Sequence, residues 1–157
     1  MSADPALIFR VAALNAAAAD AIDSDRLEDW PAFFADPCRY VVTTAENHRA
    51  GLPAGLIWAD SRAMLTDRVA ALRRANIYER QAYRHILGMP LIRAETPEGV
   101  RAETPFLVAR ILRDGKTDLF ATGRCLDLIR LDPAPCYAER IVVCDSARFD
   151  TLLALPL

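Results

Sequence analysis

Hydrophobic residues near the start of the chain recur at the spacing of one face of an α-helix. The stripe consists of Leu7, Val11, Leu14, Ala18 and Ile22. Asp4 followed by Pro5 favours a helix start, because the carboxylate can cap the first turn and a proline there needs no N–H partner. A second, short helix is predicted from Asp25, three residues before Glu28 as in a capping box, to about Trp30.

The pattern then changes to strand chemistry. The run CRYVVTT from Cys38 is β-branched and aromatic and predicts the first strand, whereas glycines and prolines within residues 45–55 predict a loop. Residues 57–58 allow a short strand before Ser61, which is expected to cap the next helix. The apolar face of that helix consists of Leu65, Val69, Leu72 and Ala75.

The second half of the chain is predicted to form strands separated by turns. The candidates are Tyr83–Ile92, Arg101–Arg113, Thr117–Arg130 and Cys136–Cys144. Asp114 and Gly115 between two apolar runs are a strong hairpin signal. Helices first and strands last predict an α+β fold, one domain over residues 1–157, with N-terminal helices packed on one face of a curved antiparallel sheet.

Both faces of the strand candidate Arg101–Arg113 are apolar. Phe106 and Val108 share one face while Leu107 lies on the other, whereas a solvated antiparallel face would alternate with polar residues. The C-terminal run TLLALPL, residues 151–157, is also apolar, and such a chain end is normally held against something. We expect burial against another chain, with burial inside this chain as the alternative.

Composition removes several classes of function. The 157 residues are 53% hydrophobic and carry a formal net charge of −2, so the chain can bury a core and has no basic field for nucleic acid or an anionic membrane. Lys116 is the only lysine beside eighteen arginines. Arginine is favoured at protein interfaces, although an arginine-rich composition is also what a GC-rich genome would encode.

The cysteines and the N-terminus indicate a soluble, cytoplasmic protein. The four cysteines have no zinc-finger or redox-pair spacing, no secretory signal is visible, and the longest uncharged runs are too short to cross a bilayer. No phosphate-binding glycine motif occurs either.

Several segments carry a family resemblance. ALRRANIYE followed by YRHIL, together with IDSDRLEDWPAFF, ENHRAGLPAGLIWADSRAMLTDR and VCDS, resembles the small (beta) subunits of aromatic ring-hydroxylating, Rieske-type dioxygenases. The resemblance implies the cone-shaped fold of nuclear-transport-factor-2-like and cystatin-like proteins. It also implies assembly of three small with three large (alpha) subunits.

In that family reading, the large subunit holds a [2Fe-2S] Rieske cluster and a mononuclear Fe(II), and a reductase supplies electrons from NADH or NADPH. The implied reaction is dihydroxylation of a carboxylated arene in aromatic catabolism, with terephthalate the first choice. The small subunit would then be a non-catalytic, structural one.

The ligand inventory of this chain agrees with that role. No cysteine is followed by histidine at the Cys-x-His or Cys-x-x-His spacing of a Rieske ligand pair, and the two histidines, His48 and His85, lie far apart in sequence. We therefore expect no catalytic, cofactor-binding or metal-ligating residue here. The candidate subunit-interface residues are Arg73, Arg74, Tyr83, Arg84 and His85.

Tyr83 and His85 leave alternatives open, because they project from the same strand face. They could form a structural hydrogen-bonded pair, or act as pocket acid and base in a stand-alone cone-fold isomerase or dehydratase. A binding module that keeps the cavity without chemistry is a third possibility.

Overall fold

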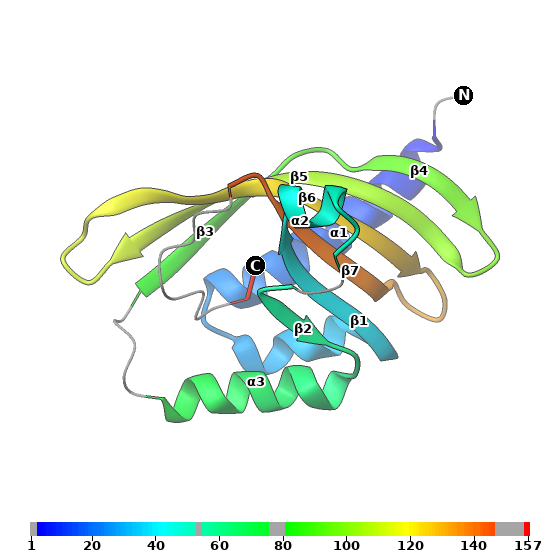
Figure 1. The fold of residues 1–157 in the computed structure, drawn as a ribbon. Coiled ribbons are helices and arrows are strands. Elements are labelled where there is room, and N and C mark those ends of the chain that lie inside the picture. Colours follow the sequence, from blue (N-terminus) through cyan, green and yellow to red (C-terminus); the bar gives the residue numbers. More distant parts are fainter. Residues whose placement is uncertain (1–2, 53–54, 76–80, 147–155) are drawn as a thin grey trace.

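A curved sheet arches over a layer of helices in the computed structural model, which describes residues 3–52, 55–75, 81–146 and 156–157 (Figure 1). In chain order the elements are α1 (Pro5–Asp23), the 3-10 helix η1 (Leu27–Phe33), β1 (Phe34–Thr44), α2 (Ala45–Arg49), β2 (Ile57–Ala59), α3 (Arg62–Arg74), β3 (Gln81–Leu87), β4 (Leu91–Thr96), β5 (Gly99–Leu112), β6 (Thr117–Arg130) and β7 (Cys136–Cys144). The predicted α+β cone with N-terminal helices on one face of the sheet is confirmed.

The strand order is β2-β1-β7-β6-β5-β3, and β4 also pairs with β5. Neighbouring strands are antiparallel except β1 and β7, which run parallel. The predicted hairpin is confirmed: Ile111 pairs with Thr117 around the turn, where Gly115 has φ of +88°. The β5–β6 hairpin and the β4–β5 hairpin extend past the helices at opposite ends of the sheet (Figure 1).

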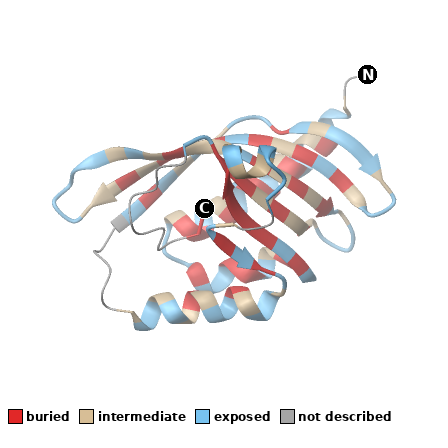
Figure 2. Cartoon of the chain, in the orientation of Figure 1, coloured by how far each residue is buried: buried red, intermediate tan, exposed pale blue. Residues whose placement is uncertain are grey.

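The core lies between α1 and the concave face of the sheet. All five residues of the predicted α1 stripe are buried. Trp30, Phe34, Tyr40 and Tyr137 add an aromatic cluster, in which Trp30 meets Tyr40 edge-on at 5.1 Å between ring centroids. Buried residues concentrate along β1 and the middle of the sheet, while both hairpin ends are exposed (Figure 2).

The residues that cap the longer helices are those predicted from the sequence. The Asp4 side chain accepts a hydrogen bond from the Ala6 N–H, and the Ser61 hydroxyl accepts one from the Met64 N–H. By length and composition alone α1 could cross a membrane, a test that the core helix of a folded domain also passes. Here its apolar stripe is buried inside the described part of the chain.

The predicted capping box at Asp25 is wrong. Asp25 has φ of +58°, and the helix that follows is a 3-10 helix with no side-chain cap on Arg26. The physical reason is that the Asp25 carboxylate accepts a hydrogen bond from Arg73 of α3, so its oxygen is engaged by another element. Tertiary contacts have overridden a local signal here.

Two boundaries also differ from the sequence prediction. Residues 45–49 form α2 instead of a loop, with the Thr44 hydroxyl accepting a hydrogen bond from the Asn47 N–H. The single strand predicted over Tyr83–Ile92 is divided into β3 and β4. Pro90 has no N–H for the ladder, and Gly88 lies so close to Pro105 that an added Cβ would come within 2.5 Å of its ring.

The end of the chain returns to its own core. Pro156 and Leu157 are buried, and the Leu157 backbone exchanges hydrogen bonds of 2.9 and 3.1 Å with the Tyr40 hydroxyl. The preferred expectation of partner burial is therefore wrong for these two residues. Residues 151–155 of the same run lie outside the described residues.

Candidate functional site

Tyr83 and His85 lie side by side on the concave face of β3, as their alternate spacing predicted, with ring centroids 6.2 Å apart. Asp23 at the end of α1 engages His85 twice. Its Oδ1 lies 2.7 Å from Nδ1, and its Oδ2 accepts a hydrogen bond from the backbone N–H at 2.8 Å. Both side chains are 5% exposed, so this pair fastens the end of α1 to the outermost strand of the sheet.

A second buried polar group occupies the middle of the concave face. Arg140 of β7 donates two hydrogen bonds of 2.8 Å to the carboxylate of Asp127 on β6, and a third of 2.8 Å to Oδ1 of Asn15 on α1. The Tyr137 hydroxyl donates to the same Asn15 oxygen at 2.7 Å. Asn15 in turn donates to Thr104 at 3.0 Å. One helix and three strands are thus joined by a polar network.

Burial governs the protonation of this network. Burial alone would lower the pKa of Arg140, but the Asp127 carboxylate outweighs it and holds that pKa well above its ordinary value. Burial likewise raises the pKa of the Tyr137 hydroxyl, with Arg140 opposing it. Arg140 is therefore a fixed cation and Tyr137 a neutral hydrogen-bond donor at physiological pH, and neither is poised to exchange a proton.

The space left between these groups is about 10 Å³. Its lining residues are Asn15, Ala19, Ile22, His85, Leu87, Phe106, Cys125, Arg140 and Leu157. A volume of this size has room for about one water molecule, whereas small-molecule sites span roughly 300–1,000 Å³. Leu157 is 4% exposed and is one of the residues that fill this region. Among the described residues, this space is too small for an aromatic acid.

The side chains present do not fit the iron groups of a Rieske oxygenase, which need paired cysteines and histidines or two histidines with a carboxylate. The four cysteines are free and spread over β1, β6 and β7. Across the described ranges, no group of three or more His, Cys, Asp or Glu side chains is arranged to hold a metal ion. His48 lies in α2 and His85 in β3.

The five interface candidates occupy different environments. Arg73 donates to Glu28 at 2.7 Å and to Asp25 at 2.8 Å, so it joins α3 to the segment around η1. Tyr83 is 2% exposed and His85 is held by Asp23. Arg74 and Arg84 are exposed, and Arg84 points away from Tyr83 as expected. Contact of this set with another chain stays a prediction.

Two carboxylates on the convex face of the sheet each pair with two arginines. Glu103 accepts hydrogen bonds from Arg93 at 3.1 Å and from Arg124 at 3.2 Å. Glu139 accepts one from Arg39 at 3.1 Å, and Arg101 lies 3.9 Å from its other oxygen. These ion pairs connect residues of β1, β4, β5, β6 and β7, so they link the strands on the side of the sheet opposite α1.

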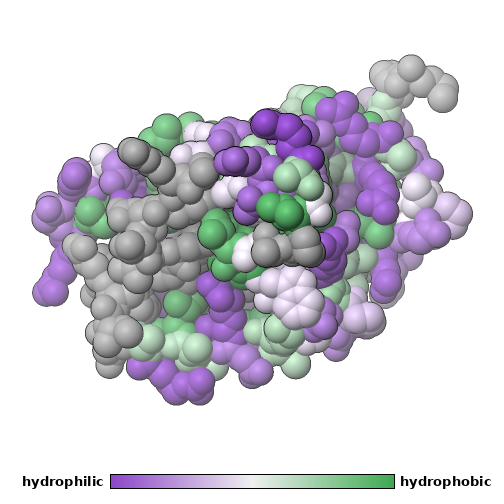
Figure 3. Space-filling model, in the orientation of Figure 1, coloured by the Kyte–Doolittle hydropathy of each residue, from purple (hydrophilic) through white to green (hydrophobic). Residues whose placement is uncertain are grey.

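Exposed apolar residues lie singly or in small groups. Phe9 and Met89, each 73% exposed, border a groove between α1 and the β3–β4 connection, while Ile86 and Leu107 are paired in register on the convex face. Leu119 stands 62% exposed on the β5–β6 hairpin. Figure 3 shows small apolar patches separated by hydrophilic side chains on the visible face.

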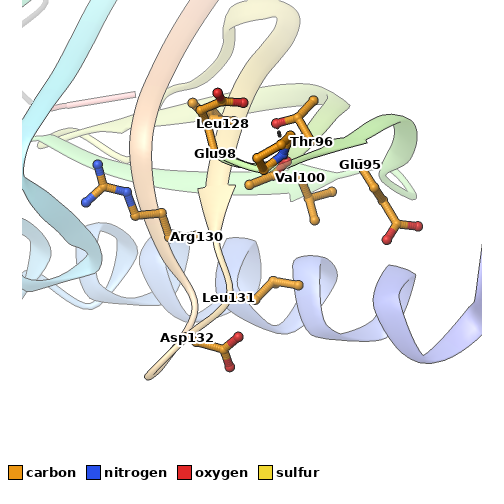
Figure 4. Close-up of a pocket in the computed structure, with 10 residues that line it drawn as sticks. Glu95, Thr96, Glu98, Val100, Leu128, Arg130, Leu131 and Asp132 are labelled. Atoms are coloured by element: carbon orange, nitrogen blue, oxygen red, sulfur yellow. Dashed lines mark hydrogen bonds between the residues drawn. The ribbon is translucent and has the colours of Figure 1, made fainter.

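A shallow groove of about 590 Å³ lies between the β4–β5 turn and the end of β6 (Figure 4). Its titratable lining residues are Glu95, Glu98, Arg130 and Asp132, beside the apolar Val100, Leu128 and Leu131. Thr96 donates to the Gly99 carbonyl at 2.9 Å and shapes the turn. The groove brings three carboxylates and one guanidinium together without a histidine, and so it offers no acid and base pair suited to chemistry near pH 7.

Sequence reasoning missed Asp23, Asn15 and the Asp127–Arg140 pair. A signal for the pair was available, because Asp127 falls on the same strand face as Cys125 and Ile129 and interrupts an otherwise apolar series. A charge at an inward position needs a partner. Nothing in the sequence pattern identified which basic residue would supply it.

Comparisons with known proteins agree on one family. The family described as ring hydroxylating beta subunit matches residues 17–151. Over 150 residues the chain is 54% identical to the terephthalate 1,2-dioxygenase terminal oxygenase component subunit beta 2 of Comamonas sp., covering 95% of this chain and 97% of the relative.

Solved structures extend the likeness. A beta subunit assigned to an aromatic-ring-hydroxylating dioxygenase of Novosphingobium aromaticivorans superposes with a TM-score of 0.89 at 36% identity, covering 97% of each chain. A protein assigned as a scytalone dehydratase from the same species superposes with a TM-score of 0.66 at 12% identity, covering 90% of this chain and 85% of the other. The second likeness concerns the fold alone.

Proposed function

The chain belongs to the ring hydroxylating beta subunit family and is the small subunit of an aromatic ring-hydroxylating dioxygenase, and we propose that its part in that enzyme is to hold the large subunits together. Catalytic activity resides in the large, alpha subunit. The stand-alone isomerase or dehydratase alternative is not favoured, since the likeness to a protein assigned as a scytalone dehydratase concerns only the fold.

The observation that carries a structural role is the small size of the space among the described residues of the concave face. The residual space of about 10 Å³ cannot admit an aromatic acid. His85 is engaged by Asp23, and Arg140 by Asp127 and Asn15. Polar groups that an enzyme would direct at a substrate are thus directed at each other, where they stiffen the subunit.

The names of the relatives support a proposal for the substrate and the other components. A 54% identical relative carries the name terephthalate 1,2-dioxygenase, which supports terephthalate, or another carboxylated arene, as the compound dihydroxylated. In the proposed complex the large subunit carries the [2Fe-2S] Rieske cluster and mononuclear Fe(II). A reductase delivers electrons from NADH or NADPH, three small subunits assemble with three large ones, and the complex works in the cytoplasm.

Co-expression tests this proposal. The large subunit is produced with and without this chain, and its assembly state is measured by light scattering. Product formation from terephthalate is measured with a supplied reductase. With this chain, a mixed oligomer that forms the cis-dihydrodiol is expected. A large subunit that assembles and turns over equally well alone would contradict the structural role.

A further inference from the structure

The convex face of the sheet has no helix packed over most of β3, β4, β5 and β6 among the described residues. Helix α1 packs on the concave side against β3, and η1 and α3 pack together on that side, while the main contacts of α2 are with β1 and β7. The uncovered strands are the ones that extend beyond the helical layer (Figure 1).

Charge is distributed unevenly on this face. The strand register assigns alternate residues to it: its basic members are Arg39, Arg84, Arg93, Arg101, Arg124 and Arg130, and its acidic members are Glu103, Glu139 and Asp145. Six arginines against three carboxylates give a formal charge of about +3 in a chain whose net charge is −2. We refer to these nine residues as the arginine face.

Four of the six arginines pair with the carboxylates of Glu103 and Glu139. The side chains of Glu103 and Glu139 are 18% and 26% exposed, whereas those of Arg93, Arg101 and Arg124 above them are 57%, 54% and 44% exposed. Burial raises the pKa of Glu103, but hydrogen bonds from Arg124 and Arg93 outweigh it and hold the pKa below its usual value. Each guanidinium has five N–H donors, so donors are left over for a partner.

Such an arrangement lowers the cost of binding, because these side chains are already ordered before a partner arrives. Apolar surface lies among them: Ile86 is 58% exposed and Leu107 is 37% exposed, and the two are paired in register. Arginine with scattered apolar residues, and almost no lysine, is the composition of protein interfaces rather than of open surface.

We propose that the arginine face docks an acidic surface of the large oxygenase subunit. The inference rests on the proposed function, and it adds which side of this chain makes the contact and what charge the partner presents. A second copy of this chain bound through the same face is the poorer occupant, because such a two-fold contact would oppose two positive surfaces.

Charge reversal tests the docking. Arg101→Glu, Arg124→Glu and the double variant are each co-expressed with the large subunit, and the affinity of the purified subunits is measured by biolayer interferometry at 50 and 300 mM NaCl. The double variant is expected to bind at least about 100-fold more weakly than wild type, since opposed like charges cost several kcal/mol. Wild-type affinity is expected to fall with added salt, and that of the variant much less.

Arg10→Glu is the matched control. Arg10 is an exposed arginine of α1, on the helical side of the molecule, and it belongs neither to the arginine face nor to the interface candidates identified from sequence. Its reversal should leave affinity within about threefold. The neutral pair Arg101→Gln and Arg124→Gln, which introduces no repulsion near Glu103, should give an intermediate loss. Circular dichroism and thermal unfolding confirm that each variant is folded.

The outcomes separate the two proposals. A wild-type chain that fails to bind the large subunit would overturn the proposed function and the docking surface together. If wild type binds and the folded double variant binds equally well, only the docking surface is overturned. Weaker self-association of the variant, with unchanged binding to the large subunit, would assign the face to a second copy and also overturn it.

Discussion

Replacing Asp127 by asparagine tests whether the buried ion pair determines the stability of this subunit. Asp127 is fully buried, and the Arg140 side chain is 10% exposed, so water cannot replace the lost charge. Asparagine has nearly the same volume and can keep one of the two hydrogen bonds, but Arg140 would then remain as a buried cation without a counter-charge.

The expected cost is about 3–5 kcal/mol, the usual result of removing one partner from a buried pair. That is a large share of the roughly 5–15 kcal/mol by which domains are stable, and at about 2–4 °C per kcal/mol it lowers Tm by roughly 6–20 °C. Urea unfolding followed by circular dichroism and by fluorescence of the buried Trp30 measures it, with the slope on urea checked for a change in mechanism.

The control is Glu139→Gln on the convex face. Glu139 pairs with Arg39 where the side chains are 26% and 48% exposed, so about 0–1 kcal/mol is expected. A double Asp127→Leu and Arg140→Met variant should recover much of the lost stability, because it removes both charges. An Asp127→Asn protein within about 1 kcal/mol of wild type, at unchanged slope, would refute the reasoning.

Three further predictions concern other parts of the molecule. Burial raises the pKa of Cys125 to about 12 and of Cys144 to about 12. A thiol reagent at pH 8 should therefore modify the half-buried Cys136 at least about 100-fold faster than either of these two cysteines. Equal modification rates by mass spectrometry would contradict this. The hydrogen bond from Arg73 lowers the pKa of Glu28, so their pair should stabilise the fold above the unfolded pKa of Glu28 and lose that contribution as pH falls through the folded value. Arg73→Gln should lower the free energy of unfolding by less than about 1 kcal/mol at pH 7 and by less still at pH 3. Urea unfolding at both pH values measures this, and an equal loss at both would contradict the prediction. Asp23→Ala should accelerate amide exchange at His85, whereas Asp23→Asn should largely preserve its protection, and identical exchange in both variants would show that Asp23 does not hold this strand.

Local patterns predicted most of the elements. The spacing of Leu7 to Ile22 located α1, and Ser61 located the start of α3. The turn at Asp114 and Gly115 placed β5 and β6, and the bounds of β6 and β7 were predicted without error. These features depend on neighbouring residues, so periodicity and turn chemistry are sufficient to find them.

The candidate site was harder to predict from the sequence, because its contacts join segments that are far apart along the chain. Asp25 has the spacing of a helix cap, but Arg73, forty-eight residues away, engages its carboxylate. Likewise His85 finds its partner in Asp23, sixty-two residues away in the chain. A sequence pattern shows that a polar residue points inward, but it does not show which other residue meets it there.

The sequence by itself therefore determined most of the elements, the inward faces of the longer helices and strands, and the family to which the chain belongs. Only the tertiary structure decided that β1 lies parallel to β7, that Leu157 is buried beside Tyr40, and that six arginines share one face of the sheet. The reason is physical: alternation and helical spacing are local properties, whereas strand neighbours, cavity filling and summed surface charge arise when segments far apart in sequence pack together.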